Sequence, residues 1–210
     1  MQNGMAGSAT PQASDRSLAM GANLLPFDGG AYLIEAALTK AEADQAFTNL
    51  METVDWRQEH AILFGRHIPV PRLTAWYGEH GYGYSGIRHQ PQAMTRDLLA
   101  LKSRAEAIWK TSFNSVLINL YRHGQDSMGW HSDDEAALGD NPIIASLSLG
   151  AARRFQFKHR KTDERINIKL SHGSCLVMAG SCQACWRHQL PKTKRVSEPR
   201  INLTFRKITP

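Results

Sequence analysis

The chain has 210 residues, with 25 Lys and Arg against 19 Asp and Glu, a formal net charge of +6 and a sequence pI near 9.4. This length supports one domain with a substantial core, and the lack of an apolar run as long as a membrane span argues against an integral membrane protein. Basic residues gather in 151–170 and 187–207, whereas 35–59 is acidic. A basic C-terminal half suits a polyanionic partner, although an ordinary solvated surface has the same composition.

Residues 1–23 are rich in Gln, Ala, Gly and Ser and lack the apolar centre of a signal peptide. We therefore expect a disordered tail, followed by a single domain over residues 24–210. The three cysteines are Cys175, Cys182 and Cys185. An odd number without a secretory signal indicates reduced thiols in a cytoplasmic protein, or a nuclear one in a eukaryote. The pattern Cys182-x-x-Cys185-x-x-His188 also permits zinc or redox chemistry, but it lacks a clear fourth zinc ligand.

Two helices are predicted in the N-terminal half. Thr39-Lys40-Ala41-Glu42 is a capping box, and apolar residues then recur at helical spacing, which predicts a helix over residues 39–54. A second apolar stripe runs from Met94 to a helix end near Lys110. After Phe113 the pattern changes to short strands, with candidates at 115–122, 143–149, 153–158, 165–170, 174–178 and 200–206. Helices followed by many strands predict an α+β, mainly β fold in which helices flank a β-sandwich.

A candidate metal site combines Trp130-His131-Ser132-Asp133 with the distant His188. In a strand, residues two apart point to the same side, so His131 and Asp133 can reach one metal without bending the backbone. Two neutral imidazoles and one carboxylate are the ligand set of a non-haem Fe(II) oxygenase, which leaves one face of the metal open. A His-x-Asp motif alone is weak, because it often occurs by accident.

The strand predicted at 200–206 carries Arg200, Asn202, Thr204 and Arg206 on one face and apolar residues on the other. The polar face lines a cavity or meets solvent. Asn119 and Tyr121 favour a cavity, because they interrupt an otherwise apolar run that should be a buried strand. A buried Asn needs hydrogen-bond partners, and a carboxylate ligand would satisfy it.

Taken together and in order, these motifs resemble the AlkB family of Fe(II)/2-oxoglutarate-dependent nucleic-acid dealkylases. The similarity runs from about residue 64 to 207 and rests on the segments 119–121, 130–135, 144–150, 188–191 and 199–206. Residues 70–78 and 82–86 are similar to the subgroup that repairs alkylated DNA. The resemblance implies a double-stranded β-helix (jelly roll) core at about 113–208, flanked by N-terminal helices and a nucleotide-recognition lid at about 60–90.

The resemblance also implies roles for particular residues of these motifs. Fe(II) would be held by His131, Asp133 and His188, and the co-substrates would be 2-oxoglutarate and O2. Arg206 would pair in bidentate fashion with the far carboxylate of 2-oxoglutarate, while Arg200 would approach the iron-chelating 1-carboxylate and Asp133. The other co-substrate contacts would be Asn119, Tyr121 and Asn202. The reaction needs no protein nucleophile.

A stacked base cannot reach a buried iron, so the substrate must be flipped out or single-stranded. Residues of the lid that would stack on the base or touch the backbone are Trp76, Tyr77, Tyr82 and Tyr84, each of which would serve equally as a core residue. Arg72 and Ser85 would position the nucleotide, and His131 would complete the stack. Glu135 would accept a hydrogen bond from an exocyclic amine, unless it is an ordinary surface acid.

Two further segments are candidate DNA contacts. Phe64, after Leu63, would act as a hydrophobic wedge in a duplex if exposed, and an ordinary core strand is the alternative. The basic hairpin supplies the candidate phosphate contacts Arg153, Arg154, Lys158, Arg160 and Lys161.

The resemblance predicts an oxidative demethylase that repairs 1-methyladenine and 3-methylcytosine in DNA and releases formaldehyde, succinate and CO2. We expect a monomer. One alternative is the same chemistry on RNA or protein. Another is a basic nucleic-acid binding module whose metal site is inactive.

Overall fold

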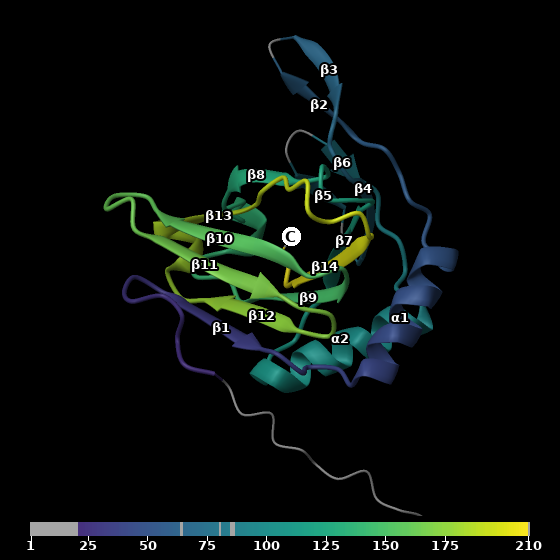
Figure 1. Cartoon of the computed structure of the whole chain (residues 1–210), viewed down its shortest axis with the longest axis horizontal. Coiled ribbons are helices and arrows are strands. Elements are labelled where there is room, and N and C mark those ends of the chain that lie inside the picture. Colours follow the sequence, from purple (N-terminus) through teal and green to yellow (C-terminus); the bar gives the residue numbers. More distant parts are fainter. Residues whose placement is uncertain (1–20, 64, 80, 85–86, 210) are drawn as a thin grey trace, which may run out of the picture.

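Two antiparallel sheets face one another in the computed structural model, which describes residues 21–63, 65–79, 81–84 and 87–209. The larger sheet has six strands in the order β1 (Gly30–Ile34), β12 (Cys175–Ala179), β9 (Ile144–Gly150), β14 (Arg200–Arg206), β7 (Ser115–Tyr121) and β4 (Leu73–Gly78). The smaller has four in the order β11 (Arg165–Leu170), β10 (Arg153–His159), β13 (Trp186–Leu190) and β8 (Met128–His131). This mainly β, α+β arrangement is the jelly roll expected from the sequence (Figure 1).

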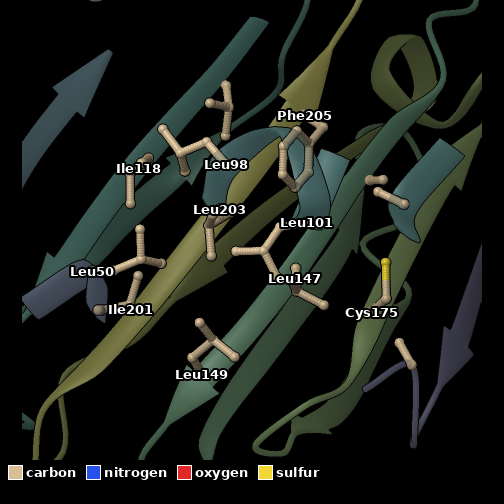
Figure 2. Packing of buried hydrophobic residues seen from close by; sticks show 14 of the residues in the cluster. Leu50, Leu98, Leu101, Ile118, Leu147, Leu149, Cys175, Ile201, Leu203 and Phe205 are labelled. Atoms are coloured by element: carbon tan, nitrogen blue, oxygen red, sulfur yellow. The ribbon is translucent and has the colours of Figure 1, made fainter. Parts of the chain in front are cut away.

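Two helices cover the outer face of the larger sheet (Figure 1). Helix α1 (Lys40–Thr53) begins after Thr39, whose side chain and Glu42 form the predicted capping box. Helix α2 (Arg96–Trp109) begins after Thr95, so its first residue lies two positions beyond Met94, where the predicted apolar stripe starts. Their apolar stripes pack on the outward side chains of β7, β9 and β14, and Figure 2 shows Leu50, Leu98 and Leu101 against this layer. Burial of these stripes holds the sheet in place on its helical side.

The second core lies between the two sheets. Leu176 and Met178 of the larger sheet face Phe157, Trp186 and Leu190 of the smaller one. The polar face of β14 also points to this side, and every residue of β14 is buried. The cavity interpretation of that face is therefore confirmed, and the solvent-facing alternative is wrong.

The range predicted as a lid is divided among three pieces. The hairpin β2 (His60–Leu63) and β3 (Arg66–Pro69) projects from the body at the top of Figure 1. A second hairpin joins β5 (Tyr82–Tyr84) to β6 (Ile87–His89). Between them, β4 pairs along its length with β7, so it belongs to the larger sheet.

Two short helical segments remain, the 3-10 turn η1 (Ala136–Leu138) and α3 (Cys182–Cys185). Within the described ranges, none of the helices has the length and apolar character needed to cross a bilayer.

Candidate active site

Neighbouring strands of the smaller sheet bring the predicted metal ligands together. His131 at the end of β8 pairs directly with His188 of β13, and their ring centroids are 4.2 Å apart. Asp133 follows β8 by two residues, which places its Oδ1 4.0 Å from Nε2 of His131. One ligand atom from each of the three residues lies within 4.8 Å of the other two. The sequence expectation that these three side chains converge is therefore met by the geometry.

The polar atoms of this triad are arranged as a cation requires. Nδ1 of His131 lies 2.8 Å from the carbonyl oxygen of Gly129. Because a carbonyl can only accept, Nδ1 carries the proton, and Nε2 is the nitrogen whose lone pair a metal would use. Oδ1 of Asp133 is buried and has no hydrogen-bond partner among the described residues. Such an atom is costly to bury unless a ligand satisfies it, so the donor set fits Fe(II).

The charges are also those of a metal site. Burial lowers the pKa of His188 to about 3, and it lowers the pKa of His131 as well. Burial opposes ionisation of Asp133, but Arg206 and the two imidazoles outweigh it and hold the pKa of Asp133 at about 2. At neutral pH the triad is therefore two neutral imidazoles and one carboxylate, the protonation state in which these groups bind a divalent cation.

A cavity opens beside the triad between the two sheets. Three arginines, from β14 and from the segment before β4, reach it together with polar and apolar residues of both sheets. Its lining comprises Arg72, Leu117, Asn119, Tyr121, Met128, His131, Asp133, Ser146, Phe155, Met178, His188, Leu190, Arg200, Asn202, Thr204 and Arg206. Cationic groups beside a metal triad suit an anionic metal-chelating ligand.

The two arginines of β14 have the opposite placement to the one expected. Nη2 of Arg206 lies 2.9 Å from Oδ2 of Asp133, so Arg206, and not Arg200, contacts the metal carboxylate. Nη2 of Arg200 donates to Oγ of Ser148 and to Oδ1 of Asn202, both at 2.8 Å. Its guanidinium also lies 5.4 Å from the centre of the Tyr121 ring. Arg200 therefore lies away from the metal carboxylate, and its position suits the far end of a dicarboxylate.

Neighbouring side chains already satisfy the amide oxygens of the cavity. Oδ1 of Asn119 accepts from Nε of Arg72 at 2.7 Å, which makes Arg72 a buried partner of the co-substrate residues. Oδ1 of Asn202 accepts from Oγ of Ser146 at 3.0 Å, and its Nδ2 donates to Oγ1 of Thr204. This network fixes the orientation of the cavity wall before any ligand binds.

A comparison with protein-family models matches residues 30–206 to the 2OG-Fe(II) oxygenase superfamily. The chain is 46% identical over 179 residues to the bovine (Bos taurus) alpha-ketoglutarate-dependent dioxygenase alkB homolog 3, covering 80% of this chain and 63% of the relative. It is 40% identical over 184 residues to the mouse (Mus musculus) DNA oxidative demethylase ALKBH2, covering 81% and 77% of the two chains. The chain belongs to the AlkB family of Fe(II)/2-oxoglutarate-dependent oxygenases.

The comparisons also bear on the fold and on length. The solved structure of OsALKBH1 superposes with a TM-score of 0.64 at 16% identity, covering 87% of this chain and all of that one, which shows the shared fold. The chain spans only 61–63% of the length of the alkB homolog 3 relatives that it matches.

Three polar residues of this AlkB-family site were not assigned from the sequence. Ser146 lines the cavity from β9, and Oγ of Ser148 accepts from Arg200. Their alternation with apolar residues in 144–150 was the signal that could have found them. Oε1 of Gln183 accepts from the backbone N–H of Asp133 at 3.0 Å. No sequence signal links Gln183 to Asp133, because the contact depends on how α3 packs against the segment after β8 that carries Asp133.

The aromatic residues predicted for the lid have different outcomes. Trp76 is 4% exposed and packs with Leu117, Leu138 and Ile208, so the structure corrects its assignment as a base-stacking residue to core packing. Tyr77 is likewise buried in the core under the helices. Tyr82 and Tyr84 belong to β5, but their side chains lie outside the described residues, as do Ser85 and Phe64. Glu135 is partly buried at the start of η1.

The basic hairpin contains one clear correction. Arg153 is 2% exposed, and its guanidinium donates to the carbonyl oxygens of His123, Gly124, Asp126 and Pro191 at 2.9–3.3 Å. It therefore holds loops together and cannot serve as a phosphate contact.

The remaining basic residues of the hairpin reach the surface. Arg154 and Lys161 are exposed. Lys158 pairs with Asp163, and Arg160 with Asp134, each at 2.8 Å.

We expect Arg153→Met to lower the free energy of unfolding by about 2–4 kcal/mol, because buried carbonyl groups lose their donor. Arg154→Ala is the matched control and should leave stability unchanged while reducing the salt dependence of DNA binding by about one charge. Urea unfolding and DNA affinity at several salt concentrations measure both effects. A loss of DNA affinity in Arg153→Met at unchanged stability would contradict the structural role.

Proposed function

We propose that the protein removes methyl groups oxidatively from N-alkylated bases in DNA, with 1-methyladenine and 3-methylcytosine as substrates. The main support is the triad of His131, Asp133 and His188 beside a cavity lined by arginines. A relative that shares 40% identity is named a DNA oxidative demethylase. We further propose that the protein acts as a monomer, in the cytoplasm or, in a eukaryote, the nucleus.

Fe(II) and 2-oxoglutarate, when bound, would supply with O2 the oxidising power that hydroxylates an N-methyl group, which then leaves as formaldehyde while 2-oxoglutarate becomes succinate and CO2. The chain's own groups position these reactants. The bond from His131 to Gly129 fixes the imidazole tautomer, and Arg206 keeps Asp133 ionised. Arg200 would hold the far carboxylate of 2-oxoglutarate, with Tyr121, Asn119 and Asn202 completing that end of the cavity.

Protein nucleophiles are not needed for this reaction, and the buried thiols are unsuited to the task. Burial raises the pKa values of Cys175 and Cys182 to about 12, so both remain protonated thiols near neutral pH.

The substrate would approach across the mouth of the cavity. Arg72 reaches the cavity from the segment before β4, and we propose that it positions the nucleotide while Glu135 accepts from the exocyclic amine of the cationic base. Tyr82, Tyr84 and Ser85 keep their proposed role in the lid. The alkylated base would have to be flipped or single-stranded to enter.

Surface cations would bind the phosphate backbone. A surface depression beside the basic hairpin is lined by Arg154, Lys192 and Arg195. We propose that these residues, with Lys161 and the partly paired Lys158 and Arg160, contact phosphates.

The test is anaerobic loading with Fe(II) and 2-oxoglutarate, followed by air and an oligonucleotide that contains 1-methyladenine, with base mass and succinate followed together. We expect loss of one methylene mass matched by succinate, and no product with His131→Ala. A matched RNA oligonucleotide tests the alternative substrate. Succinate without a change in base mass would reject this substrate, and neither signal with iron bound would favour a binding module.

A further inference from the structure

A second group of metal-ligating side chains lies outside the oxygenase site. Asp28 precedes β1, His159 ends β10 and Cys185 ends α3, and one ligand atom from each lies within 4.8 Å of the other two. Nε2 of His159 is 3.2 Å from Oδ2 of Asp28. The group is separate from the iron triad, although His159 pairs with Trp186, two residues before His188 on β13.

The side chains of this group are held by their surroundings. The His159 side chain is almost fully buried, with the rings of Phe27 and Trp186 at 5.0 and 4.9 Å. Nε1 of Trp186 donates to the carbonyl oxygens of Phe27 and Asp28, at 3.2 and 3.0 Å. Asp28 itself has a φ of +53°, a left-handed conformation that Asp tolerates better than most residues. The indole therefore fixes the backbone from which the carboxylate reaches His159.

The three ligand types point to a particular class of cation. One thiolate, one imidazole and one carboxylate suit Zn(II) and similar borderline ions, and three protein ligands leave a fourth tetrahedral position for water. The side chain of Asp28 is 53% exposed, so that position opens to solvent. Around Zn(II), such ligand atoms lie about 3.3–3.6 Å apart. Nε2 of His159 and Oδ2 of Asp28 are already at such a separation, at 3.2 Å, and the other pairs, all within 4.8 Å, need to close by at most about 1.5 Å, which the solvent-exposed carboxylate permits.

We propose that Asp28, His159 and Cys185 form a second metal site that binds Zn(II) or a similar thiophilic divalent cation. The zinc hypothesis built on Cys182 and His188 is replaced by a different ligand set. Cys182 is buried in the core between the sheets, and His188 belongs to the iron triad. A cation at the second site would cross-link the segment before β1, through Asp28, to the smaller sheet, through His159 of β10.

Proton positions are compatible with this site. Without metal, Nδ1 of His159 accepts from the backbone N–H of Thr162 at 3.1 Å, so Nε2 carries the proton and donates to Asp28. When metal takes the lone pair of Nε2, the imidazole proton moves to Nδ1, where Oγ1 of Thr162 at 3.0 Å accepts it. The Thr162 N–H then loses Nδ1 as its acceptor, and at this exposed position water can accept in its place. Cys185 loses its thiol proton, so binding releases one proton.

Co(II) is the probe, because sulfur-to-cobalt charge transfer reports a thiolate ligand and the iron triad contains no sulfur. The titration uses the full chain carrying His131→Ala, which disables the first site. We expect a near-ultraviolet charge-transfer band that saturates at one Co(II) per chain and is displaced by Zn(II). Zn(II) should also raise the unfolding temperature of this variant.

Further substitutions in the same background decide the outcome. Cys185→Ser should abolish the band, and Asp28→Asn should raise the half-saturating Co(II) concentration by more than about tenfold. Thr162→Val should weaken binding in the same direction, whereas Cys182→Ala should leave the band unchanged. The proposal is overturned if no band forms with excess Co(II), if the band survives Cys185→Ser, or if Asp28→Asn leaves affinity unchanged.

Discussion

Replacing Asp133 with Ala should abolish succinate formation while DNA binding survives. Asp133 is the single carboxylate of the triad, and its Oδ1 has no hydrogen-bond partner in the described part of the chain. Two imidazoles alone hold Fe(II) weakly, and the loss of the carboxylate also removes the ion pair with Arg206. Removing one partner of a buried ion pair costs about 3–5 kcal/mol, so the variant should also unfold at lower temperature.

Succinate release, DNA anisotropy and thermal unfolding measure the three effects of Asp133→Ala. His131→Ala separates catalysis from stability, because it removes a ligand and leaves the Arg206–Asp133 pair intact. Asp134→Ala is the matched control, since this neighbouring carboxylate pairs with Arg160 at 2.8 Å and is not part of the triad. Turnover that persists without Asp133 would contradict the metal assignment. Loss of DNA affinity without unfolding would show that Asp133 itself binds DNA.

Arg200→Lys should raise KM for 2-oxoglutarate by about 10- to 150-fold, the equivalent of one charged hydrogen bond of about 1.5–3 kcal/mol. The Arg200 guanidinium is 1% exposed and already directed by Ser148 and Asn202. A lysine keeps the charge but cannot present two parallel donors to a carboxylate. KM for the oligonucleotide should not change.

The corresponding change at Arg206 distinguishes the two arginines. Arg206→Lys disturbs Asp133 directly, so we expect a fall in kcat and in Fe(II) affinity larger than the rise in KM for 2-oxoglutarate. Lys207→Ala, at an exposed position beside Arg206, is the control for nonspecific effects of charge. If Arg206→Lys gave the large KM effect and Arg200→Lys did not, the assignment expected from the sequence, with Arg206 at the far carboxylate of 2-oxoglutarate, would be correct.

Periodicity in the sequence predicted the fold where an element was long and its pattern regular. The capping box at Thr39 and the alternation along 200–206 both led to the observed elements. By contrast, β8 and β13 were missing from the strand ranges predicted by periodicity, and only the metal-site argument placed His131 and His188 on strands. Both strands are short and mix aromatic, basic and apolar residues, so their periodicity is weak.

Predictions for the site were wrong where the spacing of residues along the chain does not show how deeply a side chain is buried. Arg200 and Arg206 share a face of β14, and only the position of the loop after β8 decides which one meets Asp133. Arg153 looked like its exposed neighbour Arg154, yet the pleat of β10 turns it inward onto four carbonyl groups. Burial of a charged side chain depends on tertiary packing, which a single strand's pattern does not report.

His131 and the arginines of the active site lie on strands that differ in their protection against local unfolding. β14 lies between β9 and β7 and is hydrogen-bonded on both sides, whereas β8, which carries His131, is at the edge of the smaller sheet. Edge strands open locally at lower free energy than central ones, so amide exchange should be faster along β8 than along β14. Fraying of β8 would release His131 from the triad while the dicarboxylate cradle on β14 stays folded. Bound metal, held by His131 of β8 and His188 of β13, would therefore stabilise the pairing of the edge strand with β13 against local opening.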